Sequence, residues 1–372
     1  MNNRERTLAV LNYERYDRLP LVHFGYWDEL LDKWAQEGHL TQEERKQYRE
    51  GSALDREISR RLGFDFNYQT MFYSNMDLSP LFERKVIEEL PNGFTKVLTG
   101  YGTYDLVKPG SLDFPPSVDY LLKGRKEWEE LYLPKLQFST ERIDWQALEA
   151  VKAADSQREY PLGLHCGSLY GNIRNWLTMQ GSAYLWADDE ALMVEIIDAL
   201  GQLCYDCLEA ILARGNWFDF AHFWEDICFN NGPLVNPRKF REYVGPHYRR
   251  ITELVNRHGL NIVSLDCDGK IDALVPIWLE NGVNTMFPIE VGTWGASIAP
   301  WRAAYGRELR GVGGLNKHVF AGDRATVDAE IERLRPLVDL GGYIPCPDHR
   351  LPPECKWENL QYYTERMHSV YG

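Results

Sequence analysis

Long apolar runs are missing from this chain of 372 residues. No stretch approaches the roughly 20 apolar residues that a helix needs to cross a bilayer. The N-terminal sequence MNNRERTLAVLNYERYDRLP also lacks the apolar core of a signal peptide. We therefore expect a cytoplasmic protein with no membrane-spanning segment.

Runs of positive charge are also missing. The chain has 41 Lys and Arg residues against 55 Asp and Glu residues, which gives a formal net charge of −14. Basic residues stand together in pairs such as Arg60-Arg61 and Arg249-Arg250, and never in longer runs. Nucleic-acid binding and docking on anionic lipid both favour a basic surface, so we expect neither.

Cysteines do not form a paired framework. There are seven, an odd number, and they are scattered through a chain too long to need disulfides for stability. Cys204 and Cys207 form a CxxC motif, but they lie inside the helical pattern of residues 191–212, which favours packing in the core over a redox or zinc role. The glycine-rich GxGxxG and P-loop motifs are absent, so the usual nucleotide signatures are missing.

The residues that are present predict a well-packed α/β protein. Hydrophobic residues make up 44% of the chain and charged residues 26%, which is enough for an ordinary core. Aromatic residues are abundant, with 12 Trp, 21 Tyr and 15 Phe. Those that follow strands are candidates for the walls of an aromatic pocket.

The stretch from Asn261 to Glu290 predicts one strand–helix–strand unit. Residues 261–265 and 283–287 are short apolar runs typical of buried strands. Residues 271–280 between them carry apolar side chains at helical spacing. Two Asp residues and a Cys follow the first strand, and a Glu follows the second. Ligands bind at this end of the strands in parallel βα folds.

The same alternation continues along the chain. Expected strands cover residues 21–25, 64–71, 161–165, 218–224, 261–265, 283–287, 309–314 and 343–345, and most are followed by a helical pattern. We therefore predict a single-domain (β/α)8 TIM barrel over residues 1–372, with a doubly wound open sheet as the alternative. Charged helices in residues 28–63 and a hairpin in residues 93–108 are expected additions.

Chemically capable side chains follow the expected strands. In a barrel they meet at one mouth. They are Tyr26, Trp27, His165, Cys166, Trp224, Glu225, Asp226, Asp266, Cys267, Asp268, Glu290, Asn316, Cys346, Asp348 and His349. Such a mixture of carboxylates, thiols and imidazoles is a possible metal site, and zinc prefers these ligand types.

Several of these residues also have ordinary structural interpretations. Asp266 and Asp268 precede a helix, where Asp is a favoured N-cap. Cys267 fits a small core residue, and Glu225 fits an ion pair as well as a functional role. Cys346 lies between two prolines, which favours a rigidly placed ligand.

Taken together, the segments resemble the uroporphyrinogen decarboxylase superfamily. The resemblance rests on residues 3–22, Glu225-Asp226 with residues 231–237, Asp268-Gly269, residues 280–284, residues 313–317 and residues 341–344. It covers nearly the whole chain and implies a (β/α)8 barrel with its site at the carboxyl end of the strands. The decarboxylase carries an arginine-rich segment after the first strand, where this chain has His23-Phe24-Gly25-Tyr26-Trp27-Asp28-Glu29. We therefore expect no activity on a polyanionic porphyrinogen.

The other branch of the superfamily comprises methyltransferases that work with a corrinoid protein. In members similar to methylcobalamin:coenzyme M enzymes, zinc is held by a His-x-Cys before a glycine and by a later Cys. The corresponding residues here are Asp266, Asp268 and Cys346. The resemblance thus implies a possible zinc site in which carboxylates replace two ligands. A related group demethylates methyl ethers, and the aromatic and acidic residues at the strand ends here suit that reaction better than thiol methylation.

The sequence hypothesis is therefore methyl transfer between a small methylated substrate and a corrinoid protein, by a monomer or homodimer. Its alternatives are a decarboxylase or lyase of a small acid, and a non-catalytic binding barrel. We predict that a metal-binding or acidic set is formed by Glu225, Asp266, Asp268 and Cys346. Proton transfer is predicted for His165 and His349. Substrate binding is predicted for His23, Tyr26, Trp27, Trp224, Glu290 and Asn316.

Overall fold

Eight parallel strands form a closed barrel in the computed structural model, which describes residues 1–91, 93–108 and 115–372. Seven strands pair in the order β15-β14-β13-β12-β9-β8-β3, and β1 pairs with β2. The strands are β1 (Val22–His23), β2 (Phe66–Asn67), β3 (Met71–Phe72), β8 (Gly163–His165), β9 (Phe220–Trp224), β12 (Val263–Asp266), β13 (Thr285–Phe287), β14 (Arg310–Leu315) and β15 (Tyr343–Pro347). We count β2 and β3 as one strand interrupted at residues 68–70.

Closure of the barrel occurs beside β1. Leu351, after β15, donates its backbone N–H to Gly25 over 3.1 Å, and Trp27 donates to Leu351 over 3.1 Å. The resulting Tyr26–Leu351 bridge is parallel, like the other pairings in the barrel. The predicted TIM barrel is therefore confirmed, and the open doubly wound sheet is excluded.

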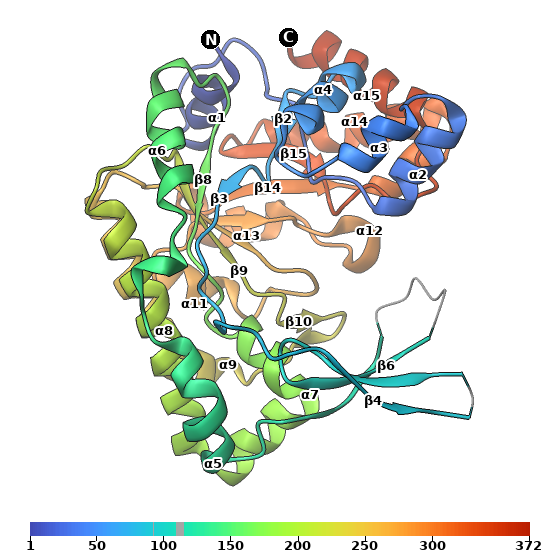
Figure 1. The fold of residues 1–372 in the computed structure, drawn as a ribbon. Helices are drawn as coiled ribbons and strands as arrows, with labels where there is room; N and C mark the ends of the chain where they lie inside the picture. Colours follow the sequence, from blue (N-terminus) through green and yellow to red (C-terminus); the bar gives the residue numbers. More distant parts are fainter. Residues whose placement is uncertain (92, 109–114) are drawn as a thin grey trace.

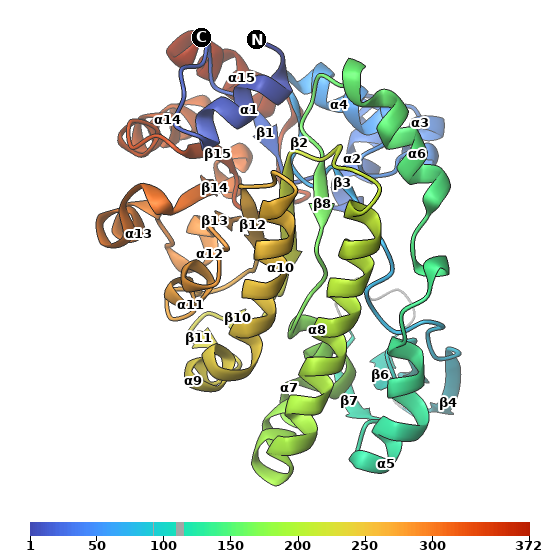
Figure 2. The same cartoon turned by 90° about the vertical axis from the view of Figure 1, so that its left-hand side faces the viewer.

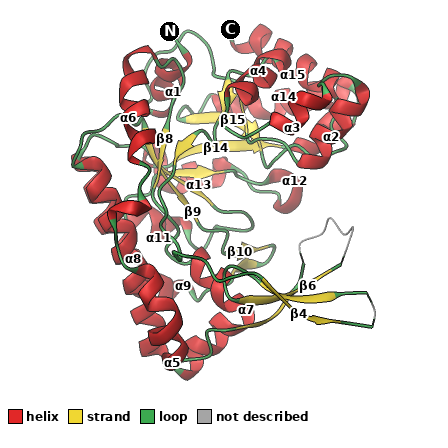
Figure 3. Cartoon of the chain, in the orientation of Figure 1, coloured by secondary structure: helices red, strands yellow, loops and turns green. Residues whose placement is uncertain are grey.

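Helices surround the strands, as Figures 1 to 3 show. In Figure 2, α8 and α10 run side by side across the outside of the barrel. The main helices are α1 (Asn3–Leu11), α4 (Ala53–Leu62), α6 (Trp145–Ala154), α7 (Gly171–Asp188), α8 (Glu190–Leu212), α10 (Gly245–Arg257), α11 (Val275–Glu280), α13 (Ile298–Tyr305), α14 (Arg324–Val338) and α15 (Trp357–Tyr371). Cys204 and Cys207 are free and fully buried in α8, so the CxxC motif packs in the core as expected. None of the helices in the described residues combines the length and the apolar character of a membrane span.

Two additions to the barrel match the expected ones. Between β1 and β2 lie α2 (Asp28–Glu37), α3 (Gln42–Gln47) and α4. Between β3 and β8 lies an antiparallel sheet of β4 (Lys85–Glu89), β5 (Thr95–Leu98), β6 (Thr103–Val107) and β7 (Ser117–Tyr120), which extends to the side in Figure 1. The pairing of β5 with β6 is the predicted hairpin.

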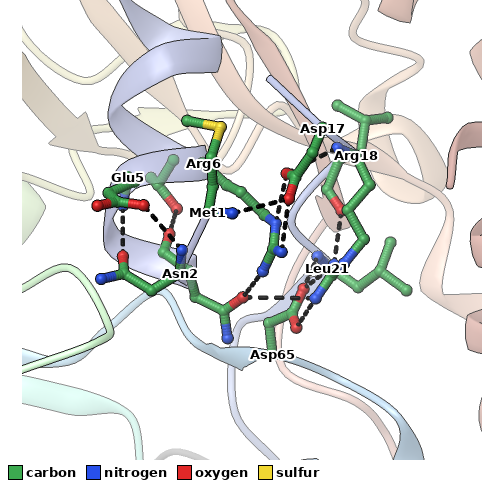
Figure 4. Close-up of polar contacts among 11 residues, drawn as sticks. Met1, Asn2, Glu5, Arg6, Asp17, Arg18, Leu21 and Asp65 are labelled. Atoms are coloured by element: carbon green, nitrogen blue, oxygen red, sulfur yellow. Dashed lines mark hydrogen bonds and ion pairs between the residues drawn. The ribbon is translucent and has the colours of Figure 1, made fainter.

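Charge pairs fix the N-terminal helix against the first two strands (Figure 4). Arg6 donates to Asp17 over 2.7 Å, and Arg18 donates to both oxygens of Asp65 over 2.7 Å. The backbone N–H of Leu21 also donates to Asp65, over 2.8 Å. This bidentate arrangement is the strong form of an Arg–carboxylate pair, and it positions β1 beside β2.

Candidate functional site

A cavity of about 480 Å³ opens at the carboxyl end of the barrel strands. Its carboxyl groups are Glu50, Asp226, Asp266 and Asp268, and its imidazoles are His165, His222 and His349. Its aromatic walls are Phe24, Trp27, Tyr73 and Trp224, and Gln69 and Arg350 complete the lining. The volume is typical of a site for a small molecule.

Strand register explains why these side chains meet. His165 of β8 pairs with His222 of β9, and Trp224 of β9 pairs with Asp266 of β12. Because side chains alternate along a strand, residues two apart on β9 face the same side. The two histidines therefore form one layer inside the barrel, and Trp224 with Asp266 forms the layer nearer the mouth.

His222 is a buried histidine that is not among the residues predicted from the sequence. Its side chain is 1% exposed, and neither ring nitrogen has a hydrogen-bond partner among the described residues. The rings of Tyr68 and Phe287 lie edge-on to it at 6.3 and 6.0 Å. Buried polar groups are normally paired, so an unpaired imidazole at a cavity is a signal of ligand binding. The one signal for this histidine in the sequence is that a polar residue stands at an inward-facing position of a strand rich in aromatic residues.

Both inner histidines are neutral at neutral pH. Burial lowers the pKa of His165 to about 4, and burial with the neighbouring His165 lowers that of His222 well below its usual value. The ring of His165 packs on Tyr73 at 4.8 Å, and its Nδ1 accepts a hydrogen bond from Gly167 over 3.3 Å. These imidazoles can give and accept hydrogen bonds, but they are poor sources of a proton.

The turn after β12 supplies two carboxyl groups. Asp266 accepts a hydrogen bond from Gln69 over 2.8 Å. Burial, and then the nearby Asp268, raise the pKa of Asp266 well above its usual value. Glu290 accepts the backbone N–H of Gly269 over 2.8 Å and thereby fixes the turn.

The expected N-cap role for these two aspartates is wrong. Helix α11 begins at Val275, later than the expected residue 271, and has Pro276 in its first turn. No side chain caps this helix. Cys267 is buried, and its sulfur accepts a hydrogen bond from the backbone of Ile227 over 3.4 Å. This contact fits the core interpretation of that thiol.

The loop after β15 brings a histidine and an arginine to the mouth. His349 stacks on Trp27, with ring centroids 5.5 Å apart and planes 18° apart. Its Nε2 lies 3.2 Å from Asp268 Oδ2. Arg350 forms an ion pair of 2.8 Å with Glu50. His349 and Asp268 thus form an imidazole–carboxylate pair in contact with solvent, which suits proton transfer.

Glu225 lies outside the cavity lining and has structural partners. It is fully buried, and its two oxygens accept five hydrogen bonds. The donors are the backbone N–H groups of Leu169, Tyr170 and Gly171 and the hydroxyls of Ser168 and Tyr248. This carboxylate anchors the loop that begins α7, which the position of Glu225 after a strand did not reveal.

Five other predicted site residues also lie outside the lining of this cavity. His23 is buried and bonded to Ser59 over 2.8 Å, and Tyr26 is buried beside it. Asn316 caps the next helical turn by accepting from His318 over 3.1 Å, Glu290 holds the turn described above, and Cys346 is fully buried. His165, Asp266, Asp268, His349, Trp27 and Trp224 are the predicted residues that the structure does bring together.

The predicted metal set is not assembled. Among the described residues there is no group of three or more His, Cys, Asp or Glu side chains placed to hold a metal ion. The oxygens of Glu225 are taken by five donors, and burial raises the pKa of the Cys346 thiol well above its usual value. Glu225 and Cys346 thus face other partners or the core, and the structure does not bring them together with Asp266 and Asp268 at the cavity.

Comparisons with known proteins agree with this architecture. The family model described as "Uroporphyrinogen decarboxylase (URO-D)" matches residues 178–370. A search of curated proteins gives no match. Among solved structures, a methyltransferase from Methanosarcina mazei matches with a TM-score of 0.65 and 14% identity over 100% of both chains. A B12-independent methionine synthase from Shewanella sp. W3-18-1 has a TM-score of 0.48 and 13% identity, covering 95% of this chain and 98% of its own.

Proposed function

Because the chain belongs to the uroporphyrinogen decarboxylase (URO-D) family, we propose that it is a methyltransferase acting between a small methylated substrate and a corrinoid protein. The observation that carries this proposal is the composition of the cavity, which is aromatic and acidic instead of basic. The methyltransferase from Methanosarcina mazei, which shares the fold over the full chain, supports it.

The cavity argues against the reaction that gives the family its name. A porphyrinogen with many carboxylates needs several cationic partners, whereas this lining has one arginine, which is paired with Glu50, and four carboxyl groups. A decarboxylase of a small acid is disfavoured by the same repulsion. A passive binding barrel requires no acid–base pair, and the contact between His349 and Asp268 favours an enzyme over that alternative.

The described residues suggest how a methyl group on a heteroatom is handled. Trp27 and Trp224 wall the mouth and exclude water from the methyl group. For a methyl ether, the class that the sequence favours, the oxygen must gain a proton as its bond to the methyl carbon breaks. The His349–Asp268 pair is placed to supply that proton, while neutral His165 orients the substrate by hydrogen bonding. A corrinoid protein docked at the open mouth would accept the methyl group.

A direct assay uses chemically reduced free cobalamin in place of the corrinoid protein. The donor panel comprises methyl ethers, methylamines and methyl-tetrahydrofolate, and methylcobalamin formation is followed by absorbance. We expect one donor class to methylate cobalamin, and Asp268→Asn to reduce the rate by about 10²-fold or more. Asp339→Asn, a matched change at an exposed residue after α14, should retain the rate. Failure of every donor, with free cobalamin and with corrinoid proteins, would contradict the proposal.

A further inference from the structure

The charges around the barrel cavity do not balance. Glu50 is paired with Arg350 at 2.8 Å, and Asp226 is paired with Arg174 at 3.1 Å. Asp266 and Asp268 have no ion pair with Lys or Arg in the described parts of the chain. Four carboxyl groups thus face two guanidinium groups. Burial and the neighbouring Asp268 raise the pKa of Asp266, so this group carries its full negative charge only when a cation lies beside it, and a protonated His349 would offset one further charge. An unbalanced pair of carboxyl groups at a cavity favours a cationic ligand.

An independent feature of the cavity favours a ligand with a polar end. His222 lines it, is 1% exposed, and has two ring nitrogens without a hydrogen-bond partner among the described residues. An unpaired buried polar group is costly, so a ligand that carries a hydroxyl or carbonyl group would recover this free energy by pairing with His222. The polar end of such a ligand would lie in the inner layer with His222 and His165.

The outer layer has the chemistry to bind an organic cation. Trp224 pairs in register with Asp266, so an indole and a carboxyl group face the same space. Phe24 and Tyr73 add aromatic surface to the lining. The faces of aromatic rings attract cations, and alkylated ammonium groups are well suited to such sites because their charge is spread over methyl groups.

We propose that the cavity selects a small organic monocation with a methylated ammonium group. The ammonium group lies between Asp266, Asp268 and the aromatic walls, and the polar end of the molecule reaches His222. This assignment rests on the proposed methyl transfer and gives it a donor class other than the methyl ether considered above, for which Asp268 acts as a counter-ion to the ammonium group and not as part of a proton source. When the carbon–nitrogen bond breaks, nitrogen keeps the electron pair and leaves as a neutral amine, so no proton is required. The electron pair of the new bond to the methyl carbon would come from a reduced corrinoid held by the partner protein.

Calorimetric titration with choline and with its neutral isostere 3,3-dimethyl-1-butanol tests the proposal. The two molecules share shape and hydroxyl group and differ in charge. We expect choline to bind at least about tenfold more tightly, which corresponds to roughly 1.4 kcal/mol. Asp268→Asn and Trp224→Leu should each weaken choline binding by about tenfold, while Asp339→Asn should leave it unchanged. Thermal unfolding of each variant shows whether it is folded.

Three results would overturn the proposal. One is equal affinity for the two molecules, and another is no binding of choline by folded wild-type protein. The third is stoichiometric binding of Zn²⁺ that Asp268→Asn abolishes and that excludes choline, which would make this a metal site. The two proposals can be refuted independently. Choline binding without cobalamin methylation would refute methyl transfer alone. Methylation from a neutral ether without choline binding would refute the cation assignment alone.

Discussion

Replacing Glu225 with Gln tests whether this carboxylate supports the fold or acts on the substrate. One oxygen accepts from the backbone of Leu169 and from the Tyr248 hydroxyl, and the other accepts from Ser168 and from two more backbone N–H groups. Gln keeps one acceptor oxygen and presents an NH₂ group in place of the other. In the less damaging of the two amide orientations, the Gln oxygen takes the place of the Glu225 oxygen that accepts two backbone N–H groups. The Tyr248 hydroxyl can then turn to accept, but the N–H of Leu169 is left unpaired.

The expected cost follows from these contacts. An unpaired buried donor costs about 1–3 kcal/mol, and each remaining hydrogen bond weakens because the acceptor is no longer charged. We therefore predict that Glu225→Gln lowers the free energy of unfolding by about 2–4 kcal/mol. Urea denaturation followed by circular dichroism measures this change. Glu253→Gln, on the exposed face of α10, is the matched control and should change stability by less than about 0.5 kcal/mol.

The two roles of Glu225 give opposite results. If it is structural, stability falls and the residual activity of the folded fraction stays near that of the wild type. Wild-type stability combined with a large loss of methyl transfer would refute this reasoning and return Glu225 to the catalytic set.

Three further predictions concern other buried groups. Burial lowers the pKa of His165 to about 4 in the folded protein, so the unfolded state binds more protons and the free energy of unfolding falls as the pH drops from about 6.5 towards 4. In unfolding experiments across that pH range, His165→Gln should reduce this loss of stability by up to about 3 kcal/mol. Cys346→Ala should leave the metal content of purified protein unchanged, whereas a loss of about one equivalent of zinc in mass spectrometry would restore the thiol as a ligand. Asp348 accepts three backbone N–H groups that join the loops after β13, β14 and β15, so Asp348→Asn should lower the free energy of unfolding by about 2–4 kcal/mol, and an unchanged urea midpoint would contradict this.

The architecture was predictable because it depends on repeated patterns. Each βα unit has its own apolar run and helical spacing, so the stretch from Asn261 to Glu290 identifies the barrel without knowledge of distant contacts. The residues that end β8, β9 and β12 were correctly placed near one another for the same reason. His165, Trp224 and Asp266 point inward because they occupy inward positions of strands whose register the barrel fixes.

The details of the site depend on contacts that sequence position does not reveal. Glu225 and Asp226 are adjacent at a strand end, yet the first is directed into the helix layer and the second lines the cavity. Asp226 has a positive φ of 50°, a local bend that no simple pattern indicates. Glu50 and Arg350 reach the cavity from loops 300 residues apart, and His222 becomes conspicuous only when its unpaired nitrogens are seen.

The most direct test of the central claim follows a labelled methyl group. Donors with a deuterated methyl group are incubated with the protein and reduced cobalamin, and mass spectrometry measures the label in methylcobalamin. Our account predicts that label is transferred at a rate proportional to enzyme concentration, and that Asp268→Asn lowers this rate while Asp339→Asn does not. Absence of label in cobalamin with every donor, or transfer that is unaffected by Asp268→Asn, would contradict methyl transfer at this cavity.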